Sequence, residues 1–287
     1  MTLSLDHFTR PAAAHDHQLG EHRITYLPDG VALLEPRVWL PDSGDQIWAE
    51  HRRLINPDGY LVASIGALLV EFGNRAMLID AGLGPLAVPT LFGLQRGGQL
   101  LDSLAATGKR LADLELIAIT HLHVDHIGWL LQSVPGTSTS LFADIPVLVG
   151  GAEWQQHDLA VAAGVSPEML DVFAAQVRPV ADGEEIFPGV HSMATPGHSL
   201  GHLAYTLTSP SHRLIVFGDA IQTPAQITHP ELTAAVDDDP AASMATCRRL
   251  IDELAAPDTL GFGMRFADVQ LGRVASNRSG GRVWQPE

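Results

Sequence analysis

Short apolar runs recur along this chain and end in polar or glycine-containing stretches, as expected for buried strands joined by turns. Ser64 to Phe72 and Arg75 to Asp80 flank a Gly73-Asn74 dipeptide, which predicts two strands joined by a tight turn. Leu114 to Thr120 is mostly apolar and has the composition of a strand buried on both faces. Further strands are predicted at 145–149, 203–208, 214–217 and 259–262.

Helical periodicity is clearest from Asp239 to about Ala255. Aspartate suits an N-cap and Pro240 suits the first helical position. The apolar residues that recur at helical spacing are Met244, Cys247, Leu250, Ile251 and Leu254. A second helix is predicted from Leu94 to Thr107, ending at Gly108. Strand pairs that alternate with helices in two similar halves predict an α/β fold with helices outside two packed sheets.

Three stretches lack this regularity. Pro28-Asp29-Gly30 interrupts the apolar runs between Arg23 and Leu40 and predicts a hairpin. Residues 41–60 are expected to form a surface excursion that overhangs a site. Residues 1–20 show no period, so we expect a flexible lead-in followed by a single domain at 21–287.

The densest group of reactive side chains is His121-Leu122-His123-Val124-Asp125-His126-Ile127-Gly128, directly after the run that ends at Thr120. If the extended backbone continues, His121 and His123 point the same way while Leu122 points into the protein. Asp125 and His126 follow where the chain turns and can face a second point close by. Imidazole nitrogens and carboxylate oxygens together are ligands for a borderline-soft divalent cation. The octet therefore predicts a metal site.

Composition limits the partners of such a site. The 287 residues carry a formal net charge of −16, which opposes extended contact with nucleic acid or an anionic membrane. A single cysteine, Cys247, excludes an internal disulfide. The first residues lack the pattern of a signal peptide, and no apolar run is long enough to span a bilayer. We expect a cytoplasmic protein with a small-molecule substrate.

The pattern His-x-His-x-Asp-His at 121–126, placed after a buried strand, resembles the signature of the metallo-β-lactamase superfamily. The resemblance extends from about Gly66 to Val274. It implies the four-layer αβ/βα sandwich of that family, in which two mixed β-sheets carry helices on their outer faces and loops from both halves meet at the metal site.

The same resemblance implies the ligands of two metals. The residues that match are His121, His123 and His198 for the first metal, and Asp125, His126 and Asp219, with Asp219 bridging, for the second. Asp80 is expected to lie behind these ligands and to orient them by hydrogen bonding, and His202 to support them. Three histidines that leave one coordination position open lower the pKa of a bound water to about 7, so hydroxide becomes available as a nucleophile. Zn²⁺ is the expected cofactor, with one or two ions per chain, although iron or manganese also suits these ligands.

One position departs from the family pattern. The family commonly places a further histidine ligand where this chain has Arg265, in the frame from Gly263 to Val274. Three interpretations remain open: the second metal is held without Arg265, which turns away; Arg265 pairs with Asp125 or Asp219 in place of that metal; or Arg265 binds an anionic group of the substrate. Asp125 and Arg265 are therefore our candidate catalytic residues.

The leading hypothesis is a metal-dependent hydrolase that attacks a small carbonyl ester or lactone with a metal-bound hydroxide, similar to the lactonase and esterase branch of the superfamily. One alternative is a glyoxalase-type thioesterase. Another is a catalytically weakened binding module, because Arg265 replaces a ligand. The sequence leaves the substrate, the metal count and the oligomeric state open, with a homodimer as one option.

Overall fold

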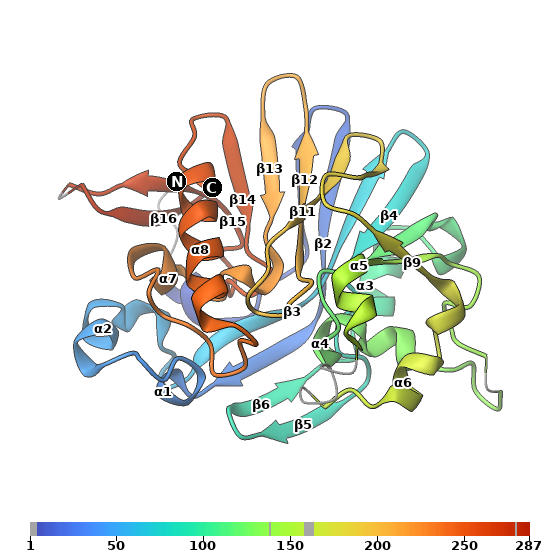
Figure 1. Cartoon of the computed structure of the whole chain (residues 1–287), viewed down its shortest axis with the longest axis horizontal. Coiled ribbons are helices and arrows are strands. Elements are labelled where there is room, and N and C mark those ends of the chain that lie inside the picture. The colour runs from blue at the N-terminus through green and yellow to red at the C-terminus, as the bar shows by residue number, and fades with distance from the viewer. Residues whose placement is uncertain (1–4, 138, 158–163, 279) are drawn as a thin grey trace.

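The computed structural model describes residues 5–137, 139–157, 164–278 and 280–287. Within these residues two mixed β-sheets pack face to face, with helices on the two outer faces (Figure 1). Figure 1 shows α8 on one side of the strands and α3, α5 and α6 on the other. The predicted layering of helices around two mixed sheets is confirmed.

The described part of the first sheet has nine strands in the order β5-β6-β2-β3-β4-β7-β8-β9, with β1 paired to β2. The strands are β1 (His15–Leu19), β2 (His22–Leu34), β3 (Leu61–Phe72), β4 (Arg75–Ile79), β5 (Ala87–Thr90), β6 (Gly93–Arg96), β7 (Leu116–Ala118), β8 (Val147–Gly150) and β9 (Val177–Val180). The pairs β4·β7, β7·β8 and β8·β9 are parallel, and the others are antiparallel.

The second sheet has seven described strands, in sequence order from β10 to β16. They are β10 (Glu185–Phe187), β11 (Val190–Ala194), β12 (Leu203–Thr208), β13 (Arg213–Val216), β14 (Thr259–Phe262), β15 (Leu271–Ser276) and β16 (Arg282–Pro286). Only β13 and β14 of these neighbours pair in parallel, because α8 crosses between them.

Short helices cover the outer faces. The α-helices are α1 (Pro36–Trp39), α2 (Asp45–Glu50), α3 (Leu100–Ala106), α4 (Val124–Ile127), α5 (Gly151–Gln155), α6 (Pro167–Asp171), α7 (Pro224–Thr228) and α8 (Pro240–Leu254). The 3₁₀ turns are η1 (Leu5–Thr9), η2 (Arg52–Leu54), η3 (Leu111–Asp113), η4 (Gly128–Leu131), η6 (Ala174–Gln176) and η7 (Gly218–Ala220). No helix in the described ranges combines the length and the apolar character that a membrane span needs.

Three apolar clusters hold the layers together. Tyr205 and Leu68 belong to the cluster between the two sheets, where side chains from one face of each sheet meet. Cys247 of α8 lies in the cluster that joins the second sheet to α7 and α8, and Leu104 of α3 lies in the cluster on the far face of the first sheet. Burial of these apolar surfaces is the main favourable contribution to folding.

The helix α8 illustrates how closely local sequence sets structure. Asp239 is its N-cap, and the carboxylate accepts a hydrogen bond of 3.0 Å from the backbone N–H of Ala242. Pro240 occupies the first helical position, where a missing N–H is harmless. Cys247 and Leu250 are buried, so the predicted apolar face is the one that packs.

The predicted hairpin at Pro28-Asp29-Gly30 is wrong. Strand β2 continues through this tripeptide with only a register shift against β3. Asp29 is fully buried, and its two carboxylate oxygens accept five hydrogen bonds. The donors are the backbone N–H groups of Leu83, Gly84, Gly98 and Leu100, at 2.8–3.1 Å, and Trp129 Nε1 at 2.7 Å. A tripeptide typical of an exposed turn is here a buried bulge whose aspartate holds three loops together.

Two further expectations differ from the structure. Residues 5–20 of the expected flexible lead-in are docked: His15–Leu19 pairs with β2 along its whole length, and Phe8 is buried. The first part of the predicted helix at Leu94 to Thr107 is strand, because Gly93–Arg96 pairs with β2. The helix starts only at Leu100.

Candidate metal centre

The end of β7 brings two histidines to one point. β7 lies between β4 and β8, and Ile117 and Ala118 are completely buried. His123 is the N-cap of α4 and has an extended backbone, with φ −78° and ψ 149°. His121 and His123 therefore project to the same side, and their ring centroids lie 4.4 Å apart. The octet prediction from strand geometry describes this pair correctly.

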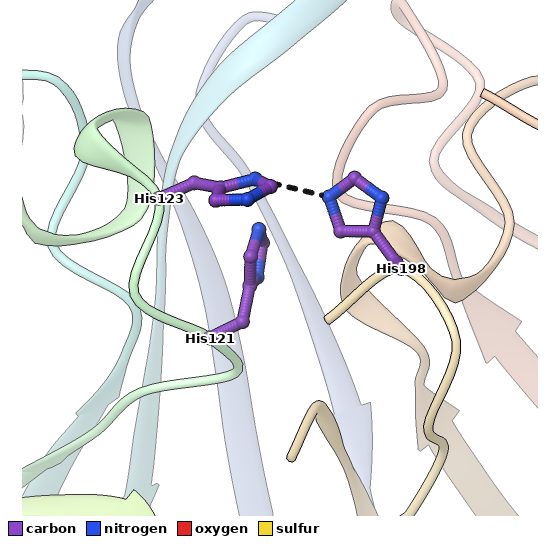
Figure 2. Close-up of side chains that lie close together, drawn as sticks. All are labelled: His121, His123 and His198. Atoms are coloured by element: carbon purple, nitrogen blue, oxygen red, sulfur yellow. Dashed lines mark hydrogen bonds between the residues drawn. The ribbon is translucent and has the colours of Figure 1, made fainter. Parts of the chain in front are cut away.

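His198 reaches the same point from the second sheet. It lies in the loop between β11 and β12, and its Nε2 atom is 3.1 Å from Nδ1 of His123 (Figure 2). One nitrogen from each of His121, His123 and His198 lies within 4.8 Å of the other two. The Nε2 atom of His121 is buried and has no hydrogen-bond partner within the described ranges. Three converging ring nitrogens, one of which has no hydrogen-bond partner, fit a divalent cation.

Burial keeps these imidazoles in the form that binds metals. Burial is the main cause that lowers the pKa of His123 to about 3, and neighbouring His198 lowers it further. Burial likewise holds the pKa of His121 well below its ordinary value, with His126 and His123 as additional causes. Both rings are therefore neutral at pH 7, and each neutral ring offers one lone pair.

His198 is oriented by groups that the sequence analysis missed. Its Nδ1 atom lies 2.8 Å from Oδ1 of Asp237, and the side-chain amide of Gln222 lies 3.0 Å from the same nitrogen. The Asp237 carboxylate fixes the proton of His198 on Nδ1 and leaves Nε2 facing His123. Asp237 is part of the run Asp237-Asp238-Asp239, in which only the N-cap role of Asp239 has a sequence signature.

Asp80 lies behind the octet, as expected from the resemblance. Its Oδ2 atom accepts a hydrogen bond of 2.8 Å from Nδ1 of His126, and Oδ1 accepts one of 2.8 Å from the backbone N–H of Thr120. The hydroxyl of Thr120 lies 3.0 Å from Nδ1 of His121. Asp80 is also one of the two non-glycine residues with positive φ in the described chain, at 64°. With this strained backbone, the carboxylate contacts His126 directly and His121 through the hydroxyl of Thr120.

The carboxylate of Glu153 connects the loop of His121 and His123 to the loop of His198. One oxygen of Glu153 accepts a hydrogen bond of 2.9 Å from the backbone of Leu122, between the two octet histidines. The other oxygen accepts hydrogen bonds from Ser199 Oγ at 2.7 Å and from the backbone of Gly201 at 3.0 Å, beside His198. The residue comes from α5, and nothing in the local sequence distinguishes it from an ordinary helix glutamate.

Asp219 enters the centre from η7, directly after β13. Its backbone N–H donates a 3.1 Å hydrogen bond to Nε2 of His202, whose Nδ1 lies 2.7 Å from the hydroxyl of Thr195. The supporting role expected for His202 thus acts on the main chain of Asp219. One carboxylate oxygen of Asp219 lies 3.3 Å from His126 Nε2 and the other 3.6 Å from His198 Nε2. Asp219 is therefore located between the two expected metal positions.

The guanidinium of Arg265 occupies the second of these positions. Its Nε atom donates to both oxygens of Asp219, at 3.1 and 2.9 Å. Its Nη2 atom is paired with Asp125 and lies 3.3 Å from Nε2 of His126. All four side chains are buried. The first interpretation, in which Arg265 turns away from a second metal, is wrong because the guanidinium contacts all three of the expected ligands.

The charges in this cluster match its geometry. Burial disfavours every charged form, but Asp125 and Asp219 raise the pKa of Arg265 above its ordinary value. Arg265 and His126 in turn hold the pKa of Asp219 well below its ordinary value against the effect of burial. Burial also opposes protonation of His126, but Asp219 and Asp80 outweigh it and raise its pKa to about 10. A protonated imidazole has no lone pair for a metal.

Comparisons with known proteins are consistent with this geometry. The family model described as the metallo-beta-lactamase superfamily matches residues 65–260, more than half of the chain. The chain belongs to this superfamily. The match begins in β3 and ends in β14, and it includes the octet, His198 and Asp219.

Two curated members of the superfamily illustrate the range of relatives. An N-acyl homoserine lactonase from Bacillus cereus is 26% identical over 178 residues, which are 56% of this chain and 65% of that protein, just under two thirds of its length. Metallo-beta-lactamase domain-containing protein 1 from Mus musculus is 27% identical over 238 residues, covering 81% of this chain and 79% of that protein.

Solved structures of the superfamily share the fold along almost the whole chain. AidC, described as a dizinc quorum-quenching lactonase in complex with an N-acyl homoserine product, superposes with a TM-score of 0.79 at 22% identity and covers 96% of this chain and 98% of its own. The hydrolase AbOPH superposes with a TM-score of 0.80 at 23% identity, covering 97% and 98%. Identities this low show the shared fold, and the roles of individual residues are argued from their geometry.

Proposed function

We propose that this chain is a metal-dependent hydrolase of small lactones and carbonyl esters, with one divalent cation, Zn²⁺, held by His121, His123 and His198. The observation that carries the proposal is the convergence of one nitrogen from each of these three residues within 4.8 Å. When bound, such a cation acts as a Lewis acid and makes water a nucleophile near neutral pH. Hydrolysis of an activated carbonyl is the reaction that this arrangement supports best.

Arg265 serves in this proposal as the second positive charge of the centre. Dinuclear hydrolases use a second cation to stabilise the negative charge that develops on a substrate oxygen. The guanidinium lies beside Asp219 and His126, and it is charged at every working pH. It carries one positive charge instead of two, and its hydrogen-bond donors provide directional contacts to an oxyanion.

Asp219 and Asp125 are the carboxylates that we propose to orient the attacking water. Asp219 is 3.6 Å from Nε2 of His198, so a water that attacks the carbonyl lies within reach of its carboxylate. Asp125 is anchored to the other side of the guanidinium. The low pKa of Asp219 keeps the carboxylate ionised, which suits orientation of the attacking water more than net removal of a proton.

N-acyl homoserine lactones are the proposed substrate class. Curated relatives and solved neighbours carry that activity in their names. A hollow beside Arg265 is lined by Phe8, Trp39 and Leu54; it has room for about one water molecule, so an acyl chain would enter only if these apolar side chains moved apart. The guanidinium of Arg265 would then face the lactone ring of the substrate.

Two measurements test the proposal. Protein reconstituted with Zn²⁺ should open N-hexanoyl homoserine lactone and hydrolyse an aryl ester, and EDTA should abolish both activities. His198→Gln should lose at least about 100-fold in turnover, because it removes one of three ligands. Turnover that survives complete chelation would refute the hydrolase.

The metal count tests the role of Arg265. Arg265→His should bind one equivalent of Zn²⁺ more than wild type, because the guanidinium no longer occupies the space between Asp125 and Asp219. Arg273→His is the matched control, since Arg273 pairs with Glu287 at the surface. An unchanged metal count in Arg265→His would show that the guanidinium is not what limits metal binding.

A further inference from the structure

A second group of metal-binding side chains lies away from the centre described above. His51 is the residue after α2, and His229 is the residue after α7. The two helices come from opposite ends of the chain, and both pack on the apolar cluster that includes α8. The rings of His51 and His229 meet edge to face, with their centroids 5.3 Å apart. Glu50, the last residue of α2, completes the group.

Two imidazole nitrogens of this group lack a hydrogen-bond partner in the described part of the chain. His51 Nε2 and His229 Nε2 are both buried, and neither has a hydrogen-bond partner among the residues that the structure describes. His51 as a whole is only 8% exposed. An imidazole nitrogen buried without a partner is destabilising, so two of them side by side need an explanation.

A carboxylate lies next to these two nitrogens. Glu50 Oε2 is 3.6 Å from His229 Nε2, and one ligand atom from each of Glu50, His51 and His229 lies within 4.8 Å of the other two. Ligands bound at 2.0–2.2 Å around a tetrahedral zinc ion are about 3.3–3.6 Å apart. The Glu50 to His229 separation already has this value, and the exposed Glu50 side chain can move to close the remainder.

The proton positions also suit a cation. His229 Nδ1 lies 3.1 Å from Oε1 of Glu231, so the N–H is on Nδ1 and the lone pair of Nε2 faces the group. A carboxylate behind a histidine is the usual outer partner of a metal ligand.

An ion pair of His229 with Glu50 and Glu231 is the alternative to a bound cation, and it does not account for His51. A protonated His229 could be placed between Glu50 and Glu231, and both carboxylates would then be satisfied. That arrangement leaves Nε2 of His51 buried against a positively charged ring, where it still lacks a partner. A divalent cation satisfies both histidines and Glu50 together.

We propose that Glu50, His51 and His229 form a separate binding site for a divalent transition metal such as Zn²⁺, with water completing its coordination. Two imidazoles and one carboxylate are ligand types that Zn²⁺ accepts, and the exposed side of Glu50 leaves the last position open to solvent. The site shares no residue with the His121, His123 and His198 group. Its metal would fasten α2 to the end of α7, and α7 begins two residues after Gln222, which contacts His198.

Metal content per chain tests this site directly. In full-length protein dialysed against Zn²⁺, Glu50→Gln and His229→Gln should each contain one equivalent less than wild type. Lactone hydrolysis should remain within about 2-fold of wild type, because neither residue belongs to the centre. His191→Gln is the matched control, since His191 lies on β11 outside both groups. Equal metal content in Glu50→Gln, His229→Gln and the control would overturn the proposal.

A second measurement separates this site from the centre. In a His121→Gln, His123→Gln background, Zn²⁺ should still raise the melting temperature, and adding Glu50→Gln should abolish the rise. Glu50 is a surface residue whose side chain is 54% exposed, so its replacement leaves the core intact. If Zn²⁺ leaves the melting temperature of the background variant unchanged, the group binds no metal and the proposal fails.

Discussion

The side chain of Arg265 donates from Nε to both carboxylate oxygens of Asp219, at 3.1 and 2.9 Å. Arg265 comes from the segment after β14 and Asp219 from the segment after β13, so two neighbouring parallel strands deliver an acid and a base to the same place. The pair is buried, and it supplies from within the chain a positive charge that a second cation would otherwise bring. We expect the fold around this position to persist without a second ion.

Removing the guanidinium should destabilise the metal-free protein strongly. Arg265→Met leaves Asp125 and Asp219 buried without their counter-charge, and breaking a buried pair from one side typically costs about 3–5 kcal/mol. The exposed pair of Arg75 and Glu115 has similar hydrogen bonds at the surface, where water screens the charges and such pairs contribute little to stability. In urea unfolding with EDTA present, the free energy of unfolding of Arg265→Met should therefore be well below that of Arg75→Met. Equal losses would show that the buried cluster is not ion-paired.

The contact between Asp237 and His198 should control metal affinity. Asp237→Asn keeps the size of the side chain but removes the negative charge that holds the proton on Nδ1 of His198. Losing such an outer partner typically weakens metal binding by about 10–100-fold. Competition with a chromophoric chelator measures the change, and Asp252→Asn, at an exposed position of α8, is the control. An affinity equal to that of the control would contradict this orienting role.

Asp29 should be among the least replaceable residues for stability. Asp29→Ala leaves five hydrogen-bond donors without their acceptor, and each buried orphan costs about 1–3 kcal/mol. We expect a loss of at least about 4 kcal/mol in the free energy of unfolding, with a smaller loss for Asp29→Asn, which keeps one acceptor oxygen. Asp16→Ala, at an exposed carboxylate, should change stability by less than about 1 kcal/mol. A small effect of Asp29→Ala would mean that water replaces the carboxylate.

Acid should destabilise the metal-free protein through its buried neutral histidines. His121, His123 and His202 have folded pKa values below the ordinary value of 6.5, mainly through burial. The unfolded chain therefore binds more protons than the folded chain as the pH falls below 6.5, and stability falls with it. His126, with its pKa raised to about 10, is protonated in both states below about pH 6 and does not offset this loss.

The expected slope is measurable. Three additional protons in the unfolded state correspond to a slope approaching about 4 kcal/mol per pH unit near pH 5. Thermal melts in EDTA at pH 7, 6 and 5 should show a steep fall in the melting temperature, and His123→Gln should reduce the slope by about one third. A melting temperature that is constant over this range would contradict neutral buried histidines.

Local sequence pattern predicted what depends on neighbours along the chain. The strands 64–72 and 259–262 and the helix from Pro240 were predicted closely, because apolar period, turn residues and capping are local properties. The pair His121 and His123 followed from the geometry of an extended strand end. His198, Asp219 and Arg265 were identified only through the resemblance to a family, because their proximity depends on contacts between distant segments.

Residues that act by burial were not predictable. Pro28-Asp29-Gly30 has the composition of a turn, and only the three loops that surround Asp29 make it a buried acceptor. Asp237 and Glu153 lie in ordinary acidic and helical contexts, and their roles follow from what they contact on another loop. Arg265 could be placed at the centre from its position in the sequence, but three orientations stayed open until its contacts with Asp125 and Asp219 were known.

His121 and His123 follow a strand of the first sheet, and His198 lies in a loop of the second sheet, 75 residues away in sequence from His123. Neither half of the polypeptide carries a complete set of donors, so a nascent chain cannot capture the ion while only its first half has emerged. Uptake of the cation becomes one of the last events of folding. Binding of a coloured ion such as cobalt would then give a visible signal that the two halves of the chain have assembled.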